Sequence, residues 1–375
     1  MPRTLLQMQL FPQSTTDPSM EKPLLSFIVV CFNQEAYIAE AIQGALAQTY
    51  SPLEIIISDD ASKDRTFEVA RETVSNYRGP HSVRLNRNPV NLGMGRHISS
   101  LMSMCHGQLV VGAAGDDVSL PERTELIYQA WESSGRRATS IFSSYDTISS
   151  KGDDLGVGGT RGDVSDATLH RPQEGSLLGF LTKNWPVVVG CTHAWSPSLF
   201  EYFGPLKSDL EDLVLSFRSL SIGKLLYIHK PLIKYRRHGE NSSFFAGWDD
   251  TSSFEHRERR LRWVNTSSAA AYENFLLDLE KLYSNGQLID AERVLLQKEA
   301  QRMKHVYTTE LRMMNEGFFG KLSAISTSVG CGYFMVALRS LPRILPLSIY
   351  RHLYILRAWW RSKISPKPIE NRTLV

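Results

Sequence analysis

Residues 27–66 read FIVVCFNQEAYIAEAIQGALAQTYSPLEIIISDDASKDRT, and this stretch decides the fold that we expect. Two short runs rich in β-branched residues, Phe27 to Val30 and Leu53 to Ile57, are too short for helices and are typical of buried parallel strands. Between them, residues 33–47 repeat apolar side chains at spacings of three and four, which predicts a helix packed against a sheet. The stretch therefore predicts a strand–helix–strand unit of an α/β protein.

Two adjacent carboxylates, Asp59 and Asp60, follow the second predicted strand. In open α/β sheets, ligands bind beyond the carboxyl ends of the strands, which is where these two residues would lie. The pair therefore predicts a nucleotide cleft at that edge of the sheet. The alternative is structural, because the same carboxylates can cap a helix, with Ser62 and Asp64 in the following turn.

A second acid pair, Asp116 and Asp117, follows the predicted strand Gln108 to Gly112. We expect it to face the same cleft, and Gly115 before it allows a tight turn. Two ionised carboxylates side by side repel each other, so a divalent cation, a hydroxyl or an arginine is expected to share their charge. The alternative is that this pair caps a helix that begins near Glu122.

Six blocks of the chain, spread in order from Leu24 to about Ser243, resemble one enzyme family. They read CFNQEAYIAEAI with LAQTY, SDDASKDRT, NPVNLGMGRHIS, GDDVSLPER, FGPLKSDLEDLVLSFRSL and IHKPLIKYRRHGENSS. This order resembles the inverting family 2 glycosyltransferases of the bacterial surface-polysaccharide type, which have the GT-A fold. The resemblance implies an α/β fold with a Rossmann-like mixed, mostly parallel sheet flanked by helices, and a C-terminal helical appendage. One departure is Ala114, which stands two residues before Asp116 where the commonest form has a further acid.

The resemblance also implies a site for a nucleotide-diphosphate sugar and a divalent cation, Mg²⁺ or Mn²⁺. Asp59 and Asp60 would lie near the base and ribose, and Asp117 would hold the cation that neutralises the departing diphosphate. The positions matched to donor binding are Cys31, Phe32, Asn33, Glu35, Asp59, Asp60, Asn91, Gly93, Asp116, Arg236 and Arg237. The positions matched to the metal are Asp117, Asp116 and His238.

A third acid pair, Glu211 and Asp212, matches the segment that supplies the family's general base. We expect Asp212, with Glu211 beside it, to take the proton of an acceptor hydroxyl while that hydroxyl attacks the anomeric carbon. The resemblance thus implies a single in-line displacement with inversion and no covalent sugar intermediate. The alternative is that both acids belong to the solvated face of a helix whose apolar face includes Leu213 and Phe217.

We expect four parts along the chain. These are a flexible leader over residues 1–22, the GT-A glycosyltransferase domain over 23–245, a helical hairpin over 246–316 and a basic amphipathic tail over 317–375. Within the second part, residues 143–174 are rich in Gly, Ser, Asp and Thr, and we expect them to form a mobile loop.

The C-terminal tail combines an uncharged run, Leu322 to Leu338, with eight Lys or Arg residues and one acid over residues 339–375. This pattern is typical of a segment that lies on an anionic membrane surface, and a buried helical tail is the alternative. The four cysteines are scattered without paired spacing, which favours a reducing compartment. We therefore expect a cytoplasmic protein, peripheral at the cytoplasmic face of the inner membrane.

Composition argues against two other classes of protein. Hydrophobic residues make up 42% of the chain, which argues against disorder throughout, and a net charge of +3 gives no nucleic-acid signature. The expected partners are a nucleotide-diphosphate sugar and a glycan or lipid-linked acceptor. Two alternatives stay open: a catalytically silent scaffold with the same fold, and a nucleotidyltransferase, although the Gly-rich basic loop of that class is missing after Val30.

Overall fold

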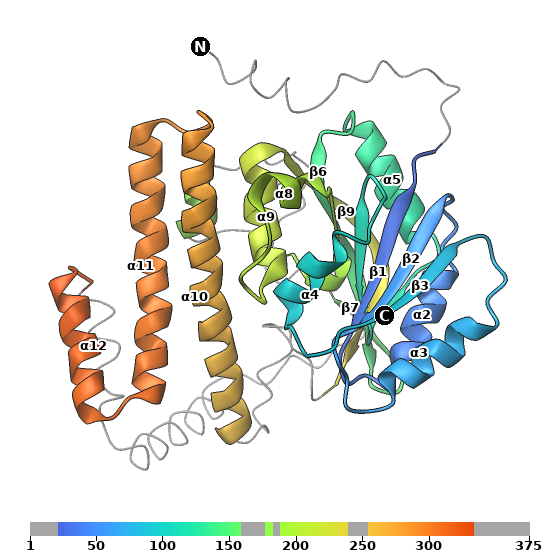
Figure 1. Ribbon diagram of the computed structural model, residues 1–375, viewed down its shortest axis with the longest axis horizontal. Helices are drawn as coiled ribbons and strands as arrows, with labels where there is room; N and C mark the ends of the chain where they lie inside the picture. The colour runs from blue at the N-terminus through green and yellow to red at the C-terminus, as the bar shows by residue number, and fades with distance from the viewer. Residues whose placement is uncertain (1–21, 159–176, 183–187, 239–253, 334–375) are drawn as a thin grey trace, which may run out of the picture. The chain divides into compact units, whose positions relative to one another are not determined.

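The computed structural model describes residues 22–158, 177–182, 188–238 and 254–333 (Figure 1). The chain divides into two compact units. The first unit comprises Met1–Ala246 and Ala270–Gln301, and the second comprises Gly247–Ala269 and Arg302–Val375.

The predicted strand–helix–strand unit is confirmed in the first unit. Strand β1 spans Leu25–Cys31 and β2 spans Leu53–Asp59, with α2 over Ile38–Leu46 between them. The next elements are α3 (Thr66–Ser75), β3 (Ser82–Arg87), α4 (Met94–Leu101), β4 (Val110–Ala114), β5 (Val118–Ser119) and α5 (Arg123–Ser133). They are followed by β6 (Ala138–Ser149), β7 (Asp154–Gly158), α7 (Leu177–Thr182), the 3₁₀ turn η1 (Gly190–Thr192), β8 (His193–Trp195), α8 (Ser198–Phe203), α9 (Glu211–Ile222) and β9 (Lys224–Arg237).

The strands of the described residues form one mixed sheet in the order β3-β2-β1-β4-β8-β6-β9-β5, with β7 paired to β6. Strands β3, β2, β1 and β4 are parallel neighbours, whereas β8 runs antiparallel to both β4 and β6. Strands β6 and β9 are also parallel. Because β2, β1 and β4 are adjacent and parallel, their carboxyl ends meet at one edge of the sheet.

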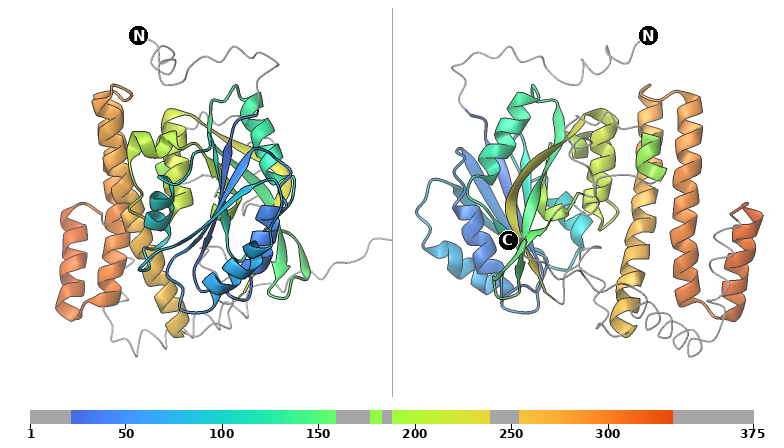
Figure 2. Two further views of the ribbon diagram at one scale, coloured as in Figure 1. Left: turned by 45° about the vertical axis from the view of Figure 1, so that its right-hand side comes forward. Right: turned by 180° about the vertical axis from the view of Figure 1, so that it is seen from behind.

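Helices cover both faces of this sheet, with α2, α3 and α5 on one face and α4, α8 and α9 on the other (Figures 1 and 2). Phe27 and Val29 of β1 are fully buried in the same core cluster as Ile42 of α2, as the alternation of a strand requires. On the opposite face, His97 of α4 lies with Nε2 2.6 Å from Ser58 Oγ of β2. The predicted mixed, mostly parallel sheet flanked by helices is therefore confirmed.

The expected loop over residues 143–174 is wrong in its first part. Strand β6 continues to Ser149, and β7 pairs with it in antiparallel register. Polar residues fit this strand because Thr147 and its neighbours pair with β9 along the sheet, which satisfies their backbone groups. Residues 159–176 lie outside the described residues.

Three helices follow the sheet: α10 (Phe254–Ser284), α11 (Asp290–Asn315) and α12 (Phe318–Gly330). The expected break between the first two is confirmed, and Gly286 adopts a positive φ of 71° in that turn. Both α10 and α11 are divided between the two compact units, so the expected domain limits at residues 245 and 316 stay predictions. In the described part of the chain, no helix is long and apolar enough to cross a membrane.

Candidate active site

The loops that follow β1, β2 and β4 are fastened to one another. The Asp60 N–H donates to Cys31 O at 2.9 Å, and the Gly115 N–H donates to Val30 O at 2.9 Å. Gly115 allows this approach, because a Cβ at that position would lie 2.6 Å from the Cβ of Cys31. The two predicted acid pairs therefore lie at the same edge of the sheet, where the sequence places them.

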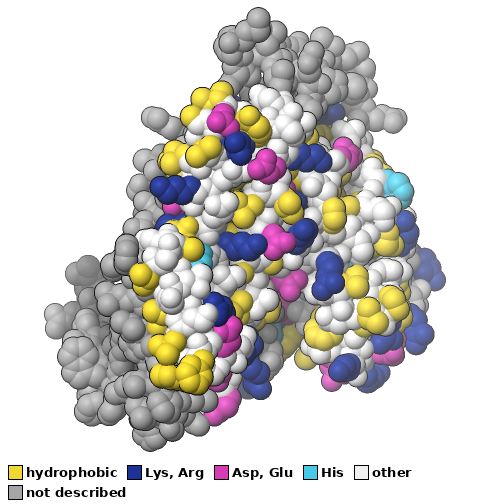
Figure 3. Space-filling model, turned by 60° about the vertical axis from the view of Figure 1, so that its left-hand side comes forward, with side chains coloured by type: hydrophobic (Ala, Val, Ile, Leu, Met, Phe, Trp, Pro, Cys, Tyr) yellow, Lys and Arg dark blue, Asp and Glu magenta, His cyan; other side chains and the backbone are white. Residues whose placement is uncertain are grey.

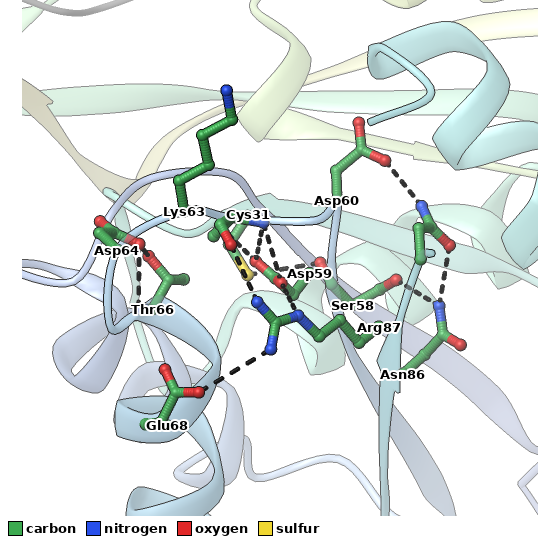
Figure 4. Close-up of polar contacts among 12 residues, drawn as sticks. Cys31, Ser58, Asp59, Asp60, Lys63, Asp64, Thr66, Glu68, Asn86 and Arg87 are labelled. Atoms are coloured by element: carbon green, nitrogen blue, oxygen red, sulfur yellow. Dashed lines mark hydrogen bonds and ion pairs between the residues drawn. The ribbon is translucent and has the colours of Figure 1, made fainter. Parts of the chain in front are cut away.

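Asp59 is buried and holds the loop after β2 onto β3. Its carboxylate accepts hydrogen bonds from the backbone N–H of Ser62 at 3.1 Å, from the Ser62 hydroxyl and from Arg87 Nε at 3.1 Å. Figure 4 shows Arg87 between Asp59 and Glu68. The hydrogen bond between Ser62 and Asp59 forms the turn that the structural alternative predicts. The predicted helix cap is not seen, because α3 begins at Thr66 without a side-chain cap.

Asp60 organises the segment that leads into α4. Its carboxylate accepts hydrogen bonds from Asn88 Nδ2 at 2.7 Å, from the Leu92 N–H at 3.0 Å and from the Gly93 N–H at 3.0 Å. Asn91 Nδ2 donates to the main-chain oxygen of Asp60 at 3.3 Å. The predicted residues Asp60, Asn91 and Gly93 are thus brought together by one cluster of hydrogen bonds.

The loop after β1 is locked to the loop after β2. Asn33 Oδ1 accepts the Lys63 N–H at 2.9 Å, and Glu35 Oε2 accepts the Arg65 N–H at 2.8 Å. Asn33 has a positive φ of 53°, which asparagine tolerates better than most residues. The Phe32 ring is exposed beside this loop, so it offers an apolar surface at the strand ends.

Asp117 is buried and bound to the protein. Its Oδ1 accepts the backbone N–H of Arg236 at 2.8 Å, and the thiol of Cys191 donates a further hydrogen bond to the carboxylate. Burial, together with the neighbouring charge of Asp116, raises the pKa of Asp117 well above its usual range. The helix-cap alternative for this acid pair is not seen, since α5 has Glu122 at its N-cap and no side-chain cap.

Asp116 points to a different partner, His238. Oδ2 of Asp116 lies 2.9 Å from Nε2 of His238, and the His238 ring lies against the ring of Tyr37 at a centroid distance of 4.9 Å. The two side chains are 12% and 10% exposed, so they retain some access to solvent. This pair therefore places an imidazole and a carboxylate together beside the end of β4.

Arg236 is fully buried and joins three parts of the site. Its Nε donates to the main-chain oxygen of Asp116 at 2.9 Å, and NH2 donates to Glu40 Oε2 of α2 at 2.8 Å. The guanidinium also lies over the Tyr37 ring, 5.0 Å from its centroid. The sequence predicts this residue as a diphosphate ligand, but the structure directs its donors to protein acceptors. The neighbouring Arg237 is exposed.

Glu211 and Asp212 form the first turn of α9 and are half-buried. Desolvation by the surrounding protein raises the pKa of Asp212 to about 6, against the opposing effect of hydrogen bonds from the N–H groups of Leu213 and Gly190. Desolvation and the neighbouring acids raise the pKa of Glu211 well above its usual range. These surroundings differ from those of the freely solvated helix face in the structural alternative.

The short turn η1 connects the second acid pair to the third. Gly190 donates its N–H to Asp212, and a Cβ on Gly190 would lie 2.2 Å from Glu211 Oε1. The next residue, Cys191, hydrogen-bonds Asp117. Two consecutive residues of η1 thus contact the acids after β4 and the acids of α9.

Asp116 and His238 have the chemistry that a divalent cation requires. Among the described residues, no group of three His, Cys, Asp or Glu side chains is arranged to hold a metal ion. Mg²⁺ in phosphate-transfer sites, however, takes only one or two carboxylates from the protein, and substrate phosphates and water complete its ligands. The carboxylate of Asp116 fits that partial set, and Nε2 of His238 lies beside it as a possible nitrogen ligand, whereas Asp117 already accepts two hydrogen bonds from the protein.

Several residues of this site escape the sequence analysis. Glu40 could have been found from the sequence, because it is an acid within the otherwise apolar helix segment AYIAEAI. Tyr37 lies within the predicted helix segment 33–47, and nothing in that pattern indicates its contacts with Arg236 and His238. Gly190 carries no signal, since no spacing rule relates a glycine to acids about twenty residues later in the chain.

Comparison with protein families matches residues 26–205 to the family described as Glycosyl transferase family 2. Among curated proteins, the chain is 32% identical over 103 residues to the putative glycosyltransferase EpsE of Bacillus subtilis. The aligned residues cover 28% of this chain and 36% of that protein. It is 27% identical over 224 residues to the uncharacterized glycosyltransferase RP339 of Rickettsia prowazekii. Here the aligned residues cover 59% of this chain and 66% of that protein. The matches thus span between about a third and about two thirds of the length of these relatives.

Among solved structures, the chain is similar to S. aureus TarS 1-349 in complex with UDP-GlcNAc. The TM-score is 0.45 and the sequence identity is 15%, over 82% of this chain and 92% of that one.

Proposed function

The chain belongs to glycosyl transferase family 2 over residues 26–205, and on that premise we propose that it transfers a sugar from a nucleotide-diphosphate donor to an acceptor hydroxyl. One observation carries the proposal: turn η1 contacts the acids after β4 through Cys191 and the acids of α9 through Gly190. A donor at the strand ends would therefore have a candidate base close to it.

The nucleoside occupies the edge formed by the loops after β1 and β2. The exposed ring of Phe32 gives the base an apolar surface, and the backbone of residues 31–33 forms one wall. Asp59 and Asp60 contribute by fixing the loops around this edge, because their carboxylates accept hydrogen bonds from Ser62, Leu92 and Gly93. This role is positional, because both carboxylates accept their hydrogen bonds from the protein itself.

Asp212 accepts the proton of the acceptor hydroxyl. A carboxyl whose pKa is raised to about 6 is mostly ionised at neutral pH and is a stronger base than an ordinary aspartate. As the hydroxyl oxygen bonds to the anomeric carbon, the bond from that carbon to the diphosphate oxygen breaks and the diphosphate leaves. Attack from the face opposite the leaving group inverts the anomeric centre.

A divalent cation is proposed at Asp116 and His238. When bound there, Mg²⁺ or Mn²⁺ would supply positive charge to the departing diphosphate. The chain's own residues hold this pair in place, since Arg236 binds the main-chain oxygen of Asp116 and Asp117 binds the N–H of Arg236. Because position 114 is an alanine and not a further acid, the remaining ligands would come from the donor and from water.

Release of nucleoside diphosphate from a panel of UDP-, GDP- and dTDP-sugars tests the proposal. We expect water to replace the acceptor hydroxyl at a low rate, so the assay does not require the natural acceptor. We expect one donor class to be hydrolysed by the native protein and not by Asp212→Asn. Equal release by the two proteins would reject Asp212 as the base, and no release from any donor in either protein would count against the transferase proposal.

We further propose that the protein works at an anionic membrane surface on a glycan or lipid-linked acceptor. Helix α12 exposes Phe318, Phe319 and Leu322, and Phe319 is 83% exposed. The sequence beyond it carries eight Lys or Arg residues against one acid over residues 339–375. On the face drawn in Figure 3, hydrophobic side chains form separate groups among charged ones of both signs. The two adjacent exposed rings of Phe318 and Phe319 on α12 are therefore our candidate for contact with the membrane.

Sedimentation with lipid vesicles tests this contact. We expect the full chain to bind vesicles of phosphatidylglycerol and phosphatidylcholine more strongly than vesicles of phosphatidylcholine alone, and Phe318→Ser/Phe319→Ser to weaken binding. The matched control is Leu155→Ser, which removes an exposed apolar side chain from β7. Equal binding by the double variant and the native chain would reject α12 as the membrane contact.

A further inference from the structure

One buried ion pair ties the middle of α9 to α10. Arg218 and Asp278 are 1% and 3% exposed, with Arg218 Nε 2.8 Å from Asp278 Oδ2 and NH2 3.2 Å from Oδ1. This is the two-point geometry in which a guanidinium holds a carboxylate in one orientation. The remaining nitrogen, NH1, donates to the Gly204 main-chain oxygen at 2.7 Å. One side chain thus joins α9, α10 and the end of α8.

A second tie lies one helical turn earlier on α10. Asn274 is buried, and its Oδ1 accepts the backbone N–H of Lys207 at 2.8 Å. Lys207 belongs to the segment that leads from α8 into α9. Between the two ties, Phe275 packs against Phe217 of α9 at a centroid distance of 4.4 Å. Helix α10 therefore holds both the approach to α9 and its middle.

Helix α4 holds the same approach through other contacts. Asp209 Oδ1 accepts the Gly95 N–H at 3.1 Å. A Cβ on Gly95 would lie only 2.0 Å from the main-chain oxygen of Ser208, so the two backbones are in direct contact. The residues immediately before Glu211 are therefore fixed by backbone contacts, and the ties from α10 hold α9 farther along its length.

We propose that Arg218 and Asp278 are positioning residues for the acids Glu211 and Asp212, and this inference rests on the proposed function. Arg218 lies seven residues after Glu211, which is about two turns along the same side of the helix. A two-point ion pair at that place prevents α9 from sliding or turning, and so fixes the acids of its first turn.

Stability alone is a weak reason for this pair. Burying two charges costs desolvation energy, and apolar residues of similar volume often give equal or greater stability. Positional precision is a better reason, because a displacement of about 1 Å in a reacting group costs about 100-fold in rate. The pair lies beyond the family match, which ends at residue 205, so that match assigns it no role.

The double variant Arg218→Met/Asp278→Leu tests the inference in the full chain. It removes both charges together, so neither is left buried without its partner, and it keeps most of the volume. With the donor-hydrolysis assay, we expect kcat to fall at least about tenfold, whereas the dissociation constant for the nucleoside diphosphate changes by less than about twofold. The control is Glu273→Gln, which removes the exposed ion pair from Glu273 to Lys207 and is expected to keep native kcat.

The outcomes separate this inference from the proposed function. Native kcat in a folded double variant would overturn the positioning role while leaving the proposed function intact. If the native protein itself hydrolyses no donor, the proposed function fails instead. If the double variant does not fold, Arg218→Lys decides the question, because lysine keeps the positive charge but cannot make the two-point contact with Asp278. A fall in kcat with unchanged nucleotide binding supports the role, and native kcat overturns it.

Discussion

Replacing Gly190 with alanine is expected to slow the proposed transfer by about 100-fold while donor binding stays intact. A methyl group at this position would lie 2.2 Å from Glu211 Oε1, and ordinary contact begins at 3.4 Å, so the carboxylate has to move by about 1.2 Å. A displacement of about 1 Å costs about 10²-fold when it affects a reacting group. The same residue donates its N–H to Asp212, so a movement of turn η1 that relieves the clash also displaces a hydrogen-bond donor of the candidate base.

The stability of this variant is expected to change much less than its activity. The added methyl meets the end of a flexible side chain rather than backbone, so the loss in free energy of unfolding should lie near the lower end of the range of about 1–3 kcal/mol for overpacking. The position lies outside the positive-φ region, so alanine adds no backbone strain.

Donor hydrolysis and calorimetric titration of the nucleoside diphosphate, measured on the same preparation, separate the two effects. The control is Gly330→Ala, the same substitution at a position where a Cβ meets nothing within 4 Å. Native kcat in a folded Gly190→Ala variant would refute the reasoning, since the acids would then tolerate displacement. Loss of nucleotide binding would also refute it, because it would place Gly190 in the donor site.

Three further predictions concern the acids and the buried arginine. Asp212 must be ionised to accept a proton, and its pKa is raised to about 6. The transfer rate of the native protein should therefore fall about tenfold per pH unit below pH 6. A rate profile that is flat between pH 7 and 5 would contradict this. Asp116→Asn is expected to remove metal-dependent stabilisation by a nucleoside diphosphate in thermal unfolding; a loss with Asp117→Asn but not with Asp116→Asn would assign the metal to Asp117. Arg236→Met is expected to lower the free energy of unfolding by about 2–3 kcal/mol, because it breaks buried charge-assisted hydrogen bonds; an unchanged urea midpoint would show that these bonds contribute nothing.

The strands that position the site were predictable because their composition is distinctive. The apolar, β-branched runs around Phe27 and Ile56 occupy β1 and β2, and the structure extends each by only a few residues. Strands β5 and β8 have two and three residues, which is too short for any alternation to show. Strand β6 was hidden for another reason, since its polar end is stabilised by pairing with β9, which is distant in sequence.

In the site, as in the fold, features set by neighbouring residues were predictable from the sequence, and contacts between distant residues were not. The sequence predicts that both acid pairs lie at one edge, because each pair follows a buried strand. The partner of each carboxylate does not follow, because Arg87 meets Asp59 and Arg236 meets Glu40 only through the folded sheet. The sequence therefore indicates where charges gather, whereas their assignment to ligand or to protein partners requires the structure.

Calorimetric titration of the native protein with UDP, GDP, dTDP and CMP, with and without Mn²⁺, tests the central claim most directly. We predict that one nucleoside diphosphate binds, that Mn²⁺ strengthens its binding, and that Asp116→Asn removes the effect of the metal. Absence of binding across the whole panel, with the protein shown to be folded, would contradict a donor site at the ends of β1, β2 and β4.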